Sequence, residues 1–242
     1  MPEEIEDYVA LLSDHQTAEL GGRTFHTGKI NGVSTVIVFS RWGKVAATTT
    51  VTTLILHFKI SELIFTGVAG AIDSRLKIGD VVIGKRFVQH DMDARPLMKQ
   101  FEIPLLGVCF FESSEALRNR AQTKMSEVLS EFPVRKNFEK MNHEIFHLHR
   151  PEIYIGDVAS GDKFFSSNTD KRHLLSILPT ILCVEMEGAA VAQVCFEYKV
   201  PFTVIRVISD QADDHAEINF SAFVKQVASK YFISFIEKYF NS

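Results

Sequence analysis

Residues 181–208 read ILCVEMEGAAVAQVCFEYKVPFTVIRVI, and this stretch indicates the fold class. The apolar run at 181–184 predicts a buried strand, the small and apolar residues of 187–198 predict a helix, and 202–208 predict a second strand. Strand, helix and strand in this order are typical of a β-α-β unit, in which a helix crosses over a parallel sheet. We therefore expect an α/β protein whose sheet is largely parallel.

The same alternation of short apolar runs and helical patterns continues along the chain. Helices are predicted at 5–12, from 114 to about 129 and from 221 onward, and strands at 33–39, 63–65, 81–83 and 153–155. Segment 44–57 is ambiguous, because its five threonines favour a strand while its length favours a helix. No linker or repeat divides the chain, so we expect a single domain over residues 1–242.

Composition excludes several classes of protein. The 242 residues are 46% hydrophobic and 23% charged, which is typical of a soluble globular protein and excludes wholesale disorder. The net charge of -4 lacks the basic surface expected of a protein that binds nucleic acid or an anionic membrane. The three cysteines form no C-x-x-C pair, and the chain shows neither a secretory leader nor an apolar run of the roughly 18 residues that a membrane span needs. We therefore expect a cytoplasmic protein with reduced thiols.

Charged side chains occur where the two strands of the opening stretch end. Glu185 and Glu187 follow the first strand, and Asp210 follows the second. Ligands of open α/β sheets bind at the carboxyl ends of the strands, so these acids are candidates for a functional site. The alternatives are an acid in the first turn of a helix for Glu187 and a turn or cap residue for Asp210. Arg206 lies inside a β-branched run, so we expect it to be buried and to need an acidic partner.

Two further segments extend this candidate site. Segment 66–71, TGVAGA, predicts a glycine turn after a strand, where the backbone can approach a ligand closely. Segment 159–165, ASGDKFF, places two aromatic rings after a turn, either in the core or against a flat base. Acids, an arginine and aromatic rings in one crevice suit the cleavage of a bond between a sugar and a heterocycle. That reaction needs an acid for the leaving group, a base for water and negative charge near the oxocarbenium-like centre.

The segment His143-Glu144-Ile145-Phe146-His147 matches the H-E-x-x-H pattern of zinc hydrolases. That pattern requires a helix, but Pro151 follows closely and disfavours helix in the residue before it. We therefore expect no metal site here. A zinc hydrolase that uses His143 and His147 is kept as the alternative from a second class of enzyme.

In the order and spacing of its motifs, the chain resembles the 5'-methylthioadenosine/S-adenosylhomocysteine nucleosidase family, within the purine-nucleoside and uridine phosphorylase superfamily. The resemblance covers nearly the whole chain. It is carried by VEME at 184–187, RVISD at 206–210, SGD at 160–162, TGVAG at 66–70 with GD at 79–80, GKVAA at 43–47 and HDMD at 90–93. It implies a nucleoside phosphorylase-like fold with a central mixed twisted sheet of nine to ten strands flanked by helices. It also implies a homodimer, a small nucleoside substrate and no cofactor.

The resemblance assigns catalytic roles to individual residues. It implies that Asp210 is the general acid that protonates N7 of adenine, supported by Ser209. Glu187 would bind the ribose hydroxyls. Glu4 would activate the attacking water, with Arg206 beside it.

The resemblance also implies a substrate-binding set. Phe164 would stack on adenine, the backbone at Phe165 would read the purine edge, and Phe220 would close over the ligand. The residues expected to complete the substrate pocket are Val68, Ala69, Gly70 and Met186.

The chain departs from the family pattern at Val68, where the family often has Ser with a hydroxyl near the sugar, and in two segments. The family usually opens with an apolar strand before a Met-x-Glu-Glu segment, and Met1 stands at that point here, so we expect this strand to be absent. Segment 94–98 reads ARPLM where many members carry Thr-Ala-Phe-Gly-Tyr. We therefore expect Arg95 near the 5' substituent, where its charge would favour a carboxylate; the alternative is that Arg95 faces solvent or pairs with Asp93.

These features predict an adenine-releasing N-ribosyl hydrolase. Its candidate substrates are methylthioadenosine, adenosylhomocysteine and 6-amino-6-deoxyfutalosine, the last on a menaquinone route. A phosphate-dependent nucleoside phosphorylase on the same fold is the nearest alternative, which the negative charge of Glu4 disfavours because phosphate needs a basic pocket. A nucleoside sensor without catalysis is a further alternative.

Overall fold

The computed structural model describes residues 3–131, 149–212 and 220–241. In chain order its elements are α1 (Glu3–Val9), β1 (Ser13–Leu20), β2 (Arg23–Ile30), β3 (Val33–Ile37), α2 (Lys44–Leu56), β4 (Leu63–Ala71), β5 (Val81–Gln89), β6 (Phe111–Glu112), α3 (Glu115–Glu131), β7 (Ile153–Ser160), α5 (Asn168–Ile177), β8 (Ile181–Glu185), α6 (Gly188–Tyr198), β9 (Phe202–Asp210), α7 (Phe220–Phe223), the π-helical segment η2 (Val224–Ala228) and α8 (Ser229–Tyr239). The predicted α/β class is confirmed.

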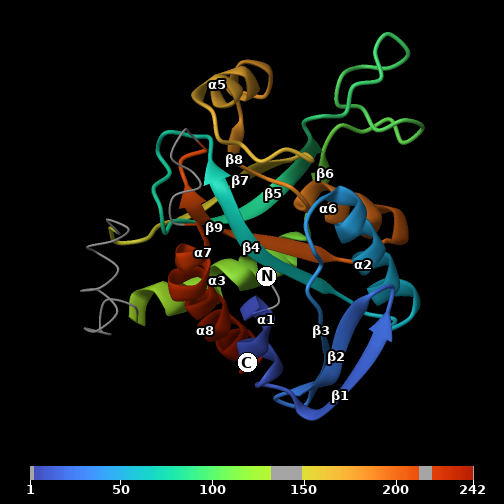
Figure 1. The fold of residues 1–242 in the computed structure, drawn as a ribbon, viewed down its shortest axis with the longest axis vertical. Coiled ribbons are helices and arrows are strands. Elements are labelled where there is room, and N and C mark those ends of the chain that lie inside the picture. The colour runs from blue at the N-terminus through green and yellow to red at the C-terminus, as the bar shows by residue number, and fades with distance from the viewer. Residues whose placement is uncertain (1–2, 132–148, 213–219, 242) are drawn as a thin grey trace.

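The strands form two sheets rather than the one expected (Figure 1). The smaller sheet has the order β1-β2-β3 and is antiparallel. The larger sheet has the order β6-β5-β7-β8-β4-β9 and is mixed, as predicted. Its parallel pairs are β5/β7, β7/β8 and β4/β9, while β4/β8, β5/β6 and β5/β9 are antiparallel. Because β5 also pairs with β9, the larger sheet closes into a barrel.

The prediction of a β-α-β unit over 181–208 is wrong in its pairing, although its strands and helix are correct. Strand β4 lies between β8 and β9, antiparallel to β8 and parallel to β9. The sheet curves so strongly that α6 connects two strands that are not neighbours. Local apolar periodicity carries no information about which strand lies between them.

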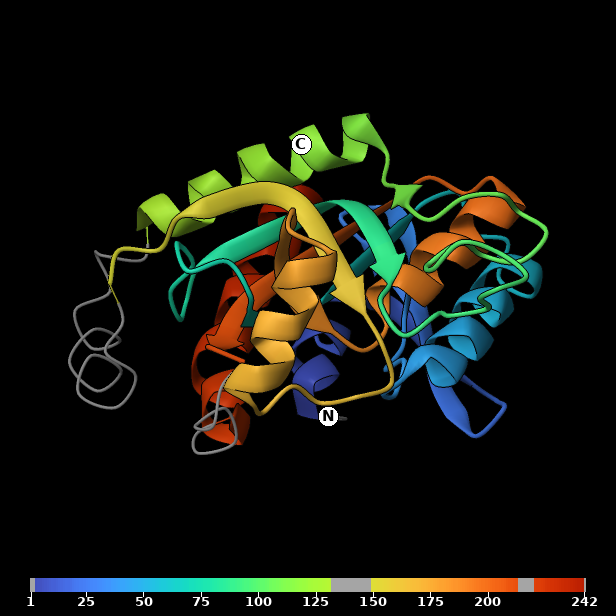
Figure 2. The same cartoon turned by 90° about the horizontal axis from the view of Figure 1, so that it is seen from above.

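Helices cover the barrel on two sides (Figures 1 and 2). Helices α2 and α6 pack together over one apolar cluster, which includes Val51 and Val191. Helices α3 and α8 pack together over a second cluster, which includes Met125 and Phe235. Across the described residues, no helix is both long and apolar enough to cross a membrane.

The ambiguous segment 44–57 is a helix, α2. Three of its five threonines donate their hydroxyls to carbonyls one turn earlier, among them Thr49 to Val45 at 2.9 Å and Thr53 to Thr49 at 2.9 Å. Thr50 in the same way donates to the carbonyl of Ala46. A side-chain bond of this kind satisfies the hydroxyl without breaking the helical ladder.

The predicted glycine turn at 66–71 is instead part of β4. Its glycines serve close approach by side chains from the neighbouring strand. A Cβ at Gly67 would lie 2.9 Å from Nη1 of Arg206, and a Cβ at Gly70 would lie 2.8 Å from Oδ1 of Asp210. Glycine in this strand therefore makes room for the charged groups of β9.

Candidate active site

The carboxyl ends of three strands meet at one residue of β4. Gly70 pairs with Val184 of β8 on one side and with Asp210 of β9 on the other. This register brings Glu185, which ends β8, and Glu187, which precedes α6, to the same place as Asp210. The structure thus brings together the acids that the sequence analysis singled out, even though β8 and β9 are not neighbours.

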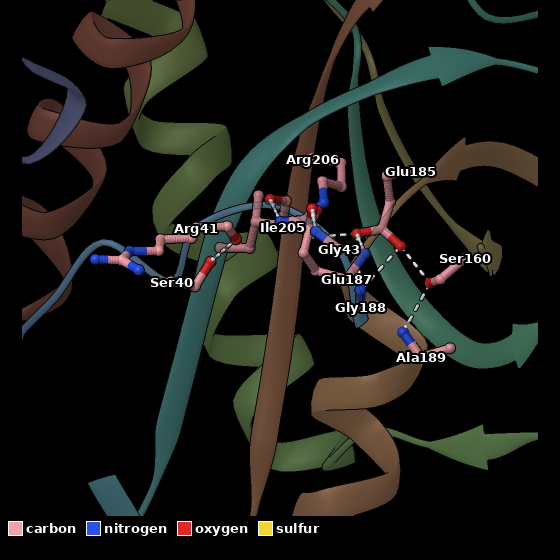
Figure 3. Close-up of polar contacts among 10 residues, drawn as sticks. All are labelled: Ser40, Arg41, Gly43, Ser160, Glu185, Glu187, Gly188, Ala189, Ile205 and Arg206. Atoms are coloured by element: carbon pink, nitrogen blue, oxygen red, sulfur yellow. Dashed lines mark hydrogen bonds and ion pairs between the residues drawn. The ribbon is translucent and has the colours of Figure 1, made fainter. Parts of the chain in front are cut away.

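Arg206 and Glu185 form a buried ion pair at this point (Figure 3). Nη2 of Arg206 lies 2.6 Å from Oε2 of Glu185, and their side chains are 1% and 3% exposed. The guanidinium also lies over the ring of Phe65, 4.3 Å from its centroid. The expectation that Arg206 is buried beside an acid is confirmed, and the acid is Glu185, one of the candidate acids at the strand ends, to which the family resemblance assigned no role.

Glu185 also holds the start of α6. Its carboxylate accepts the backbone N–H of Glu187 at 3.1 Å and that of Gly188 at 2.8 Å. Ser160 donates its hydroxyl to the same carboxylate and accepts the N–H of Ala189 at 2.7 Å. Helix starts leave N–H groups without partners, and a carboxylate there is further stabilised by the helix dipole. One carboxylate therefore positions both Arg206 and the turn that carries Glu187.

Glu187 lies between Glu185 and the loop before α2 (Figure 3). Its Oε1 accepts the backbone N–H of Gly43 at 2.8 Å. Burial and, to a smaller extent, the charge of Glu185 raise the pKa of Glu187 from 4.5 to about 7, against the opposing effects of Arg206 and of backbone N–H groups. A carboxyl group with a pKa near neutrality in a cavity is a candidate for a functional site.

The Gly43 loop is held in place by a cluster of charges. Lys44 donates its backbone N–H to Oδ1 of Asp162 at 2.8 Å and its ammonium to Oδ1 of Asp91 at 2.5 Å. Asp91 in turn accepts the N–H of Asp162 at 3.0 Å. In the sequence these residues belong to motifs shared with the nucleosidase family, and the motifs alone assign them no role. Each of these three charged residues follows a glycine or a histidine in the sequence. That pattern is too common to assign a function by itself.

Asp210 is fixed by its own strand end. It accepts the hydroxyl of Ser209 at 2.7 Å and the N–H of Ala212 at 2.8 Å. Asp210 and Ser209 are both buried. A carboxyl group held by two donors on the wall of a cavity presents a defined face to a ligand.

A cavity of about 1180 Å³ opens over these groups. Phe164 and Phe165 lie on its wall; Phe164 is 40% exposed, whereas Phe165 is 8% exposed and packs edge-on against His90. The other expected residues that line the cavity are Val68, Ala69, Gly70, Met186, Glu187, Arg206, Ser209 and Asp210. Acids, Arg206 and the rings of Phe164 and Phe165 on the wall of one cavity suit a small ligand with a polar sugar and a flat base.

Three expected site residues are not placed in this cavity. Arg95 is exposed, does not line the cavity and forms a 2.5 Å ion pair with Asp93, so the alternative given for it is the arrangement observed. Because Arg95 is exposed and lies only two residues after Asp93, it forms this ion pair within its own loop. The backbones of Glu4 and Phe220 lie in α1 and α7, but their side chains are outside the described residues. Ile5 and Tyr8 of α1 do line the cavity.

The zinc pattern at His143 and His147 also lies outside the described residues. His149, which follows it, is described and binds Oδ1 of Asp80 at 2.9 Å. Within the described ranges, no group of three or more His, Cys, Asp or Glu side chains is arranged to hold a metal ion.

The structure is a mixed barrel flanked by helices, with carboxylates where three strands end. These features define the class as an α/β protein that binds a small polar ligand. Residues 1–241 match the family model described as the phosphorylase superfamily. The chain belongs to this family.

Characterised relatives give more detail. The chain is 35% identical over 246 residues to the aminodeoxyfutalosine nucleosidase of Helicobacter pylori, covering 98% of this chain and 95% of that protein. It is 33% identical over 205 residues to the 5'-methylthioadenosine/S-adenosylhomocysteine nucleosidase of Staphylococcus aureus, covering 84% of this chain and 80% of the relative. The crystal structure of the Streptococcus pneumoniae MTA/SAH nucleosidase with 8-aminoadenine matches with a TM-score of 0.81 and 30% identity, over 98% of this chain and 96% of that one.

Proposed function

We propose that this protein is a nucleosidase that hydrolyses the N-ribosyl bond of 5'-substituted adenosine-type nucleosides and releases adenine. The observation that carries the proposal is that Asp210, Glu187 and Arg206 meet on one cavity beside Phe164, in a chain whose relatives are named as nucleosidases of this kind. The substrates named for those relatives are aminodeoxyfutalosine, methylthioadenosine and adenosylhomocysteine.

The proposed roles follow from the chemistry of the bond. Asp210 donates a proton to the departing adenine, so that the base leaves as a neutral molecule. Glu187 accepts hydrogen bonds from the ribose hydroxyls and places negative charge beside the oxocarbenium-like sugar. Glu4 takes a proton from the water whose oxygen bonds to the anomeric carbon. Arg206 orients that water. The bond formed is carbon to oxygen, and the bond broken is carbon to nitrogen.

Adenine recognition is proposed for the two aromatic residues. Phe164 stacks on the base, because its ring is partly exposed on the cavity wall. Phe165 is buried, so its backbone rather than its ring is proposed to contact the purine edge. Arg95 is left out of the proposed site because it pairs with Asp93 away from the cavity.

Adenine release with each of the three nucleosides tests the function. We expect turnover in phosphate-free buffer that contains EDTA, with the 5-substituted ribose rather than its 1-phosphate as the sugar product. Turnover that requires phosphate would identify a phosphorylase, and turnover lost with EDTA and restored by zinc would identify a metal hydrolase. Nucleoside binding without release of adenine would identify a sensor.

We further propose that residues 1–242 form a single domain that works as a homodimer in the cytoplasm. The resemblance to the nucleosidase family supports the dimer. Cys109, Cys183 and Cys195 are free thiols, which fits a reducing compartment. Light scattering on the purified protein tests the dimer, and cell fractionation tests the location.

A further inference from the structure

Three neighbouring strands of the larger sheet each end two residues before an acid. Strands β5, β7 and β8 are followed in this way by Asp91, Asp162 and Glu187. Because β5 pairs with β7 and β7 pairs with β8, both in parallel, the three strand ends lie side by side at one edge of the sheet. Of the three acids, Glu187 lines the cavity, whereas Asp91 and Asp162 do not.

Two consecutive residues at the start of α2 donate one hydrogen bond to each of these acids. The backbone N–H of Gly43 binds Oε1 of Glu187 at 2.8 Å (Figure 3). The next N–H, that of Lys44, binds Oδ1 of Asp162 at 2.8 Å, and Nζ of Lys44 binds Oδ1 of Asp91 at 2.5 Å. The first N–H groups of a helix have no partner within the helix, so these bonds fix the place where α2 begins. The position of the Gly43 N–H therefore depends on the partners of Lys44.

The ammonium of Lys44 lies between two carboxylates. Its Nζ is 2.5 Å from Asp91 and 4.0 Å from Asp162, and Oδ2 of Asp91 also accepts the N–H of Asp162 at 3.0 Å. Burial acts to raise the pKa of Asp91, but the hydrogen bonds from Lys44 and from the N–H of Asp162 hold that pKa below its usual value. Without the ammonium, two like charges would lie close together and repel each other. That repulsion would displace Asp162, which is the acceptor for the N–H next to Gly43.

Lys44 also contacts the end of the sheet itself. Its Nζ lies 3.3 Å from Oε1 of Gln89, the last residue of β5. Gln89 in turn donates to Oε1 of Gln193 in α6 at 2.7 Å. The side chain of Lys44 is only 18% exposed. One lysine thus connects the start of α2 to a strand end and, through Gln89, to the helix that follows Glu187.

We propose that Lys44 is a positioning residue for the nucleosidase reaction. Its contacts with Asp91 and Asp162 hold the loop before α2, and this loop holds the N–H of Gly43 on the carboxylate of Glu187. The inference rests on the proposed function, in which Glu187 binds the ribose hydroxyls. A carboxylate that is already oriented before the substrate binds needs no rearrangement when charge develops on the sugar.

The Gly43 bond also favours the charged form of Glu187. Burial and the charge of Glu185 raise the pKa of Glu187, whereas Arg206 and the N–H of Gly43 lower it. The ionised carboxylate is the form that stabilises an oxocarbenium-like sugar. A loop that moves away from Glu187 therefore removes both a constraint on its orientation and a donor to its charge.

The amide of Gly43 provides a measurement that does not depend on turnover. Trp42 is the only tryptophan of the chain and directly precedes Gly43, so carbonyl-labelled tryptophan with nitrogen-labelled glycine selects this one peptide N–H in an NMR spectrum. We expect its resonance in the wild type to titrate with a midpoint near pH 7, the pKa of Glu187. In Lys44→Met the titration should be lost, because the N–H no longer points at the carboxylate. Asp91→Asn, which removes the charge but keeps the shape, should weaken it in the same direction.

Kinetics separate positioning from a purely structural role. We expect Lys44→Met to lower kcat by between about tenfold and 10²-fold, which is the cost of misplacing a group that orients the substrate. Free adenine should bind as tightly as it binds to the wild type. The reason is that the segment of Phe164 keeps an anchor of its own, the N–H of Gly161 on the carbonyl of Glu185 at 3.2 Å.

Lys238→Met is the matched control, because it removes a lysine from an ion pair with Glu131 on the outer helices. It should change neither the Gly43 titration nor kcat. A Gly43 resonance that does not titrate in the wild type, or that titrates unchanged in Lys44→Met, overturns the proposal. Loss of the titration with an unchanged kcat, or equal losses in kcat and adenine affinity, also overturns it. A wild type that releases adenine from no nucleoside overturns the proposed function instead, and the Gly43 titration still decides whether Lys44 holds the loop.

Discussion

Arg206 of β9 and Glu185 of β8 form an ion pair across β4, with 2.6 Å between Nη2 and Oε2 and almost no solvent access to either side chain. Strand β4 lies between strands β8 and β9 and carries glycine at position 67, where any side chain would meet the guanidinium of Arg206. Because Glu185 also binds the first N–H groups of α6, the pair couples β9 to the helix start that presents Glu187.

This coupling predicts that substitutions of Glu185 and Arg206 have strongly non-additive effects on the free energy of unfolding. Glu185→Gln and Arg206→Met should each lower the free energy of unfolding by about 3–5 kcal/mol, because each leaves one buried charge without its partner. The double variant should lose much less than the sum of the two. Urea unfolding measures all three variants. Glu131→Gln, which breaks the more exposed pair with Lys238, is the control and should cost about 1 kcal/mol or less. Additive losses would mean that the pair is not coupled.

The raised pKa of Glu187 predicts a pH-dependent contribution to stability. Burial and Glu185 raise its pKa to about 7 in the folded protein, above the value of 4.5 for an unperturbed glutamate. Ionisation is therefore less favourable in the folded state, so the stability that the protonated group contributes is complete below about pH 4.5 and is lost as the pH rises through 7. Glu187→Gln should remove this loss. Urea unfolding at pH 5 and pH 8 should show the variant gaining relative to the wild type at pH 8.

The matched control for this prediction is Asp93→Asn. The pKa of Asp93 lies near 2, so its protonation does not change between pH 5 and pH 8. A constant difference between Glu187→Gln and the wild type at the two pH values would contradict a pKa near 7.

Asp210→Asn should reduce turnover far more than it weakens inhibitor binding. Asparagine keeps the shape of the side chain: its amide oxygen can accept the N–H of Ala212, and its NH2 group can donate to the hydroxyl of Ser209. It has no acidic proton to give to the base. General acid catalysis is typically worth about 10²–10⁴ in rate. Steady-state adenine release and calorimetric binding of an adenine analogue measure the two effects. Asp93→Asn, outside the cavity, should leave both unchanged. Turnover within a few-fold of the wild type would remove Asp210 from the acid role.

The two neighbouring phenylalanines should separate binding from stability. Phe164→Ala should weaken binding of adenine by about tenfold or more, because stacking on a base is worth about 1–3 kcal/mol, while the melting temperature changes little. Phe165→Leu should instead lower the melting temperature slightly, since that ring is buried against His90, and should preserve adenine binding. Calorimetry and thermal unfolding distinguish these outcomes. If Phe165→Leu weakens adenine binding and Phe164→Ala does not, the ring of Phe165 rather than that of Phe164 stacks on the base.

The sequence alone determined the elements that have a strong local pattern. The apolar runs predicted as strands at 181–184 and 202–208 lie in β8 and β9, and the intervening helix is α6, because an apolar run with polar ends is a sufficient signal for a buried element. The burial of Arg206 and its need for an acid also followed from its β-branched neighbours. The acids at both strand ends were predicted as one site because strand ends gather at one edge of such a sheet.

Only the tertiary structure decided how these elements combine. It placed β4 between β8 and β9, closed the barrel through β5 and β9, and made Glu185 the partner of Arg206. It also placed the glycines of 66–71 in a strand against charged side chains and turned Arg95 to Asp93. The physical reason is the sequence separation of the interacting residues. Periodicity reports which face of a single element is buried. Strand order, the choice of ion-pair partner and the close approach of side chains depend on residues that are distant in the chain and that only folding brings together.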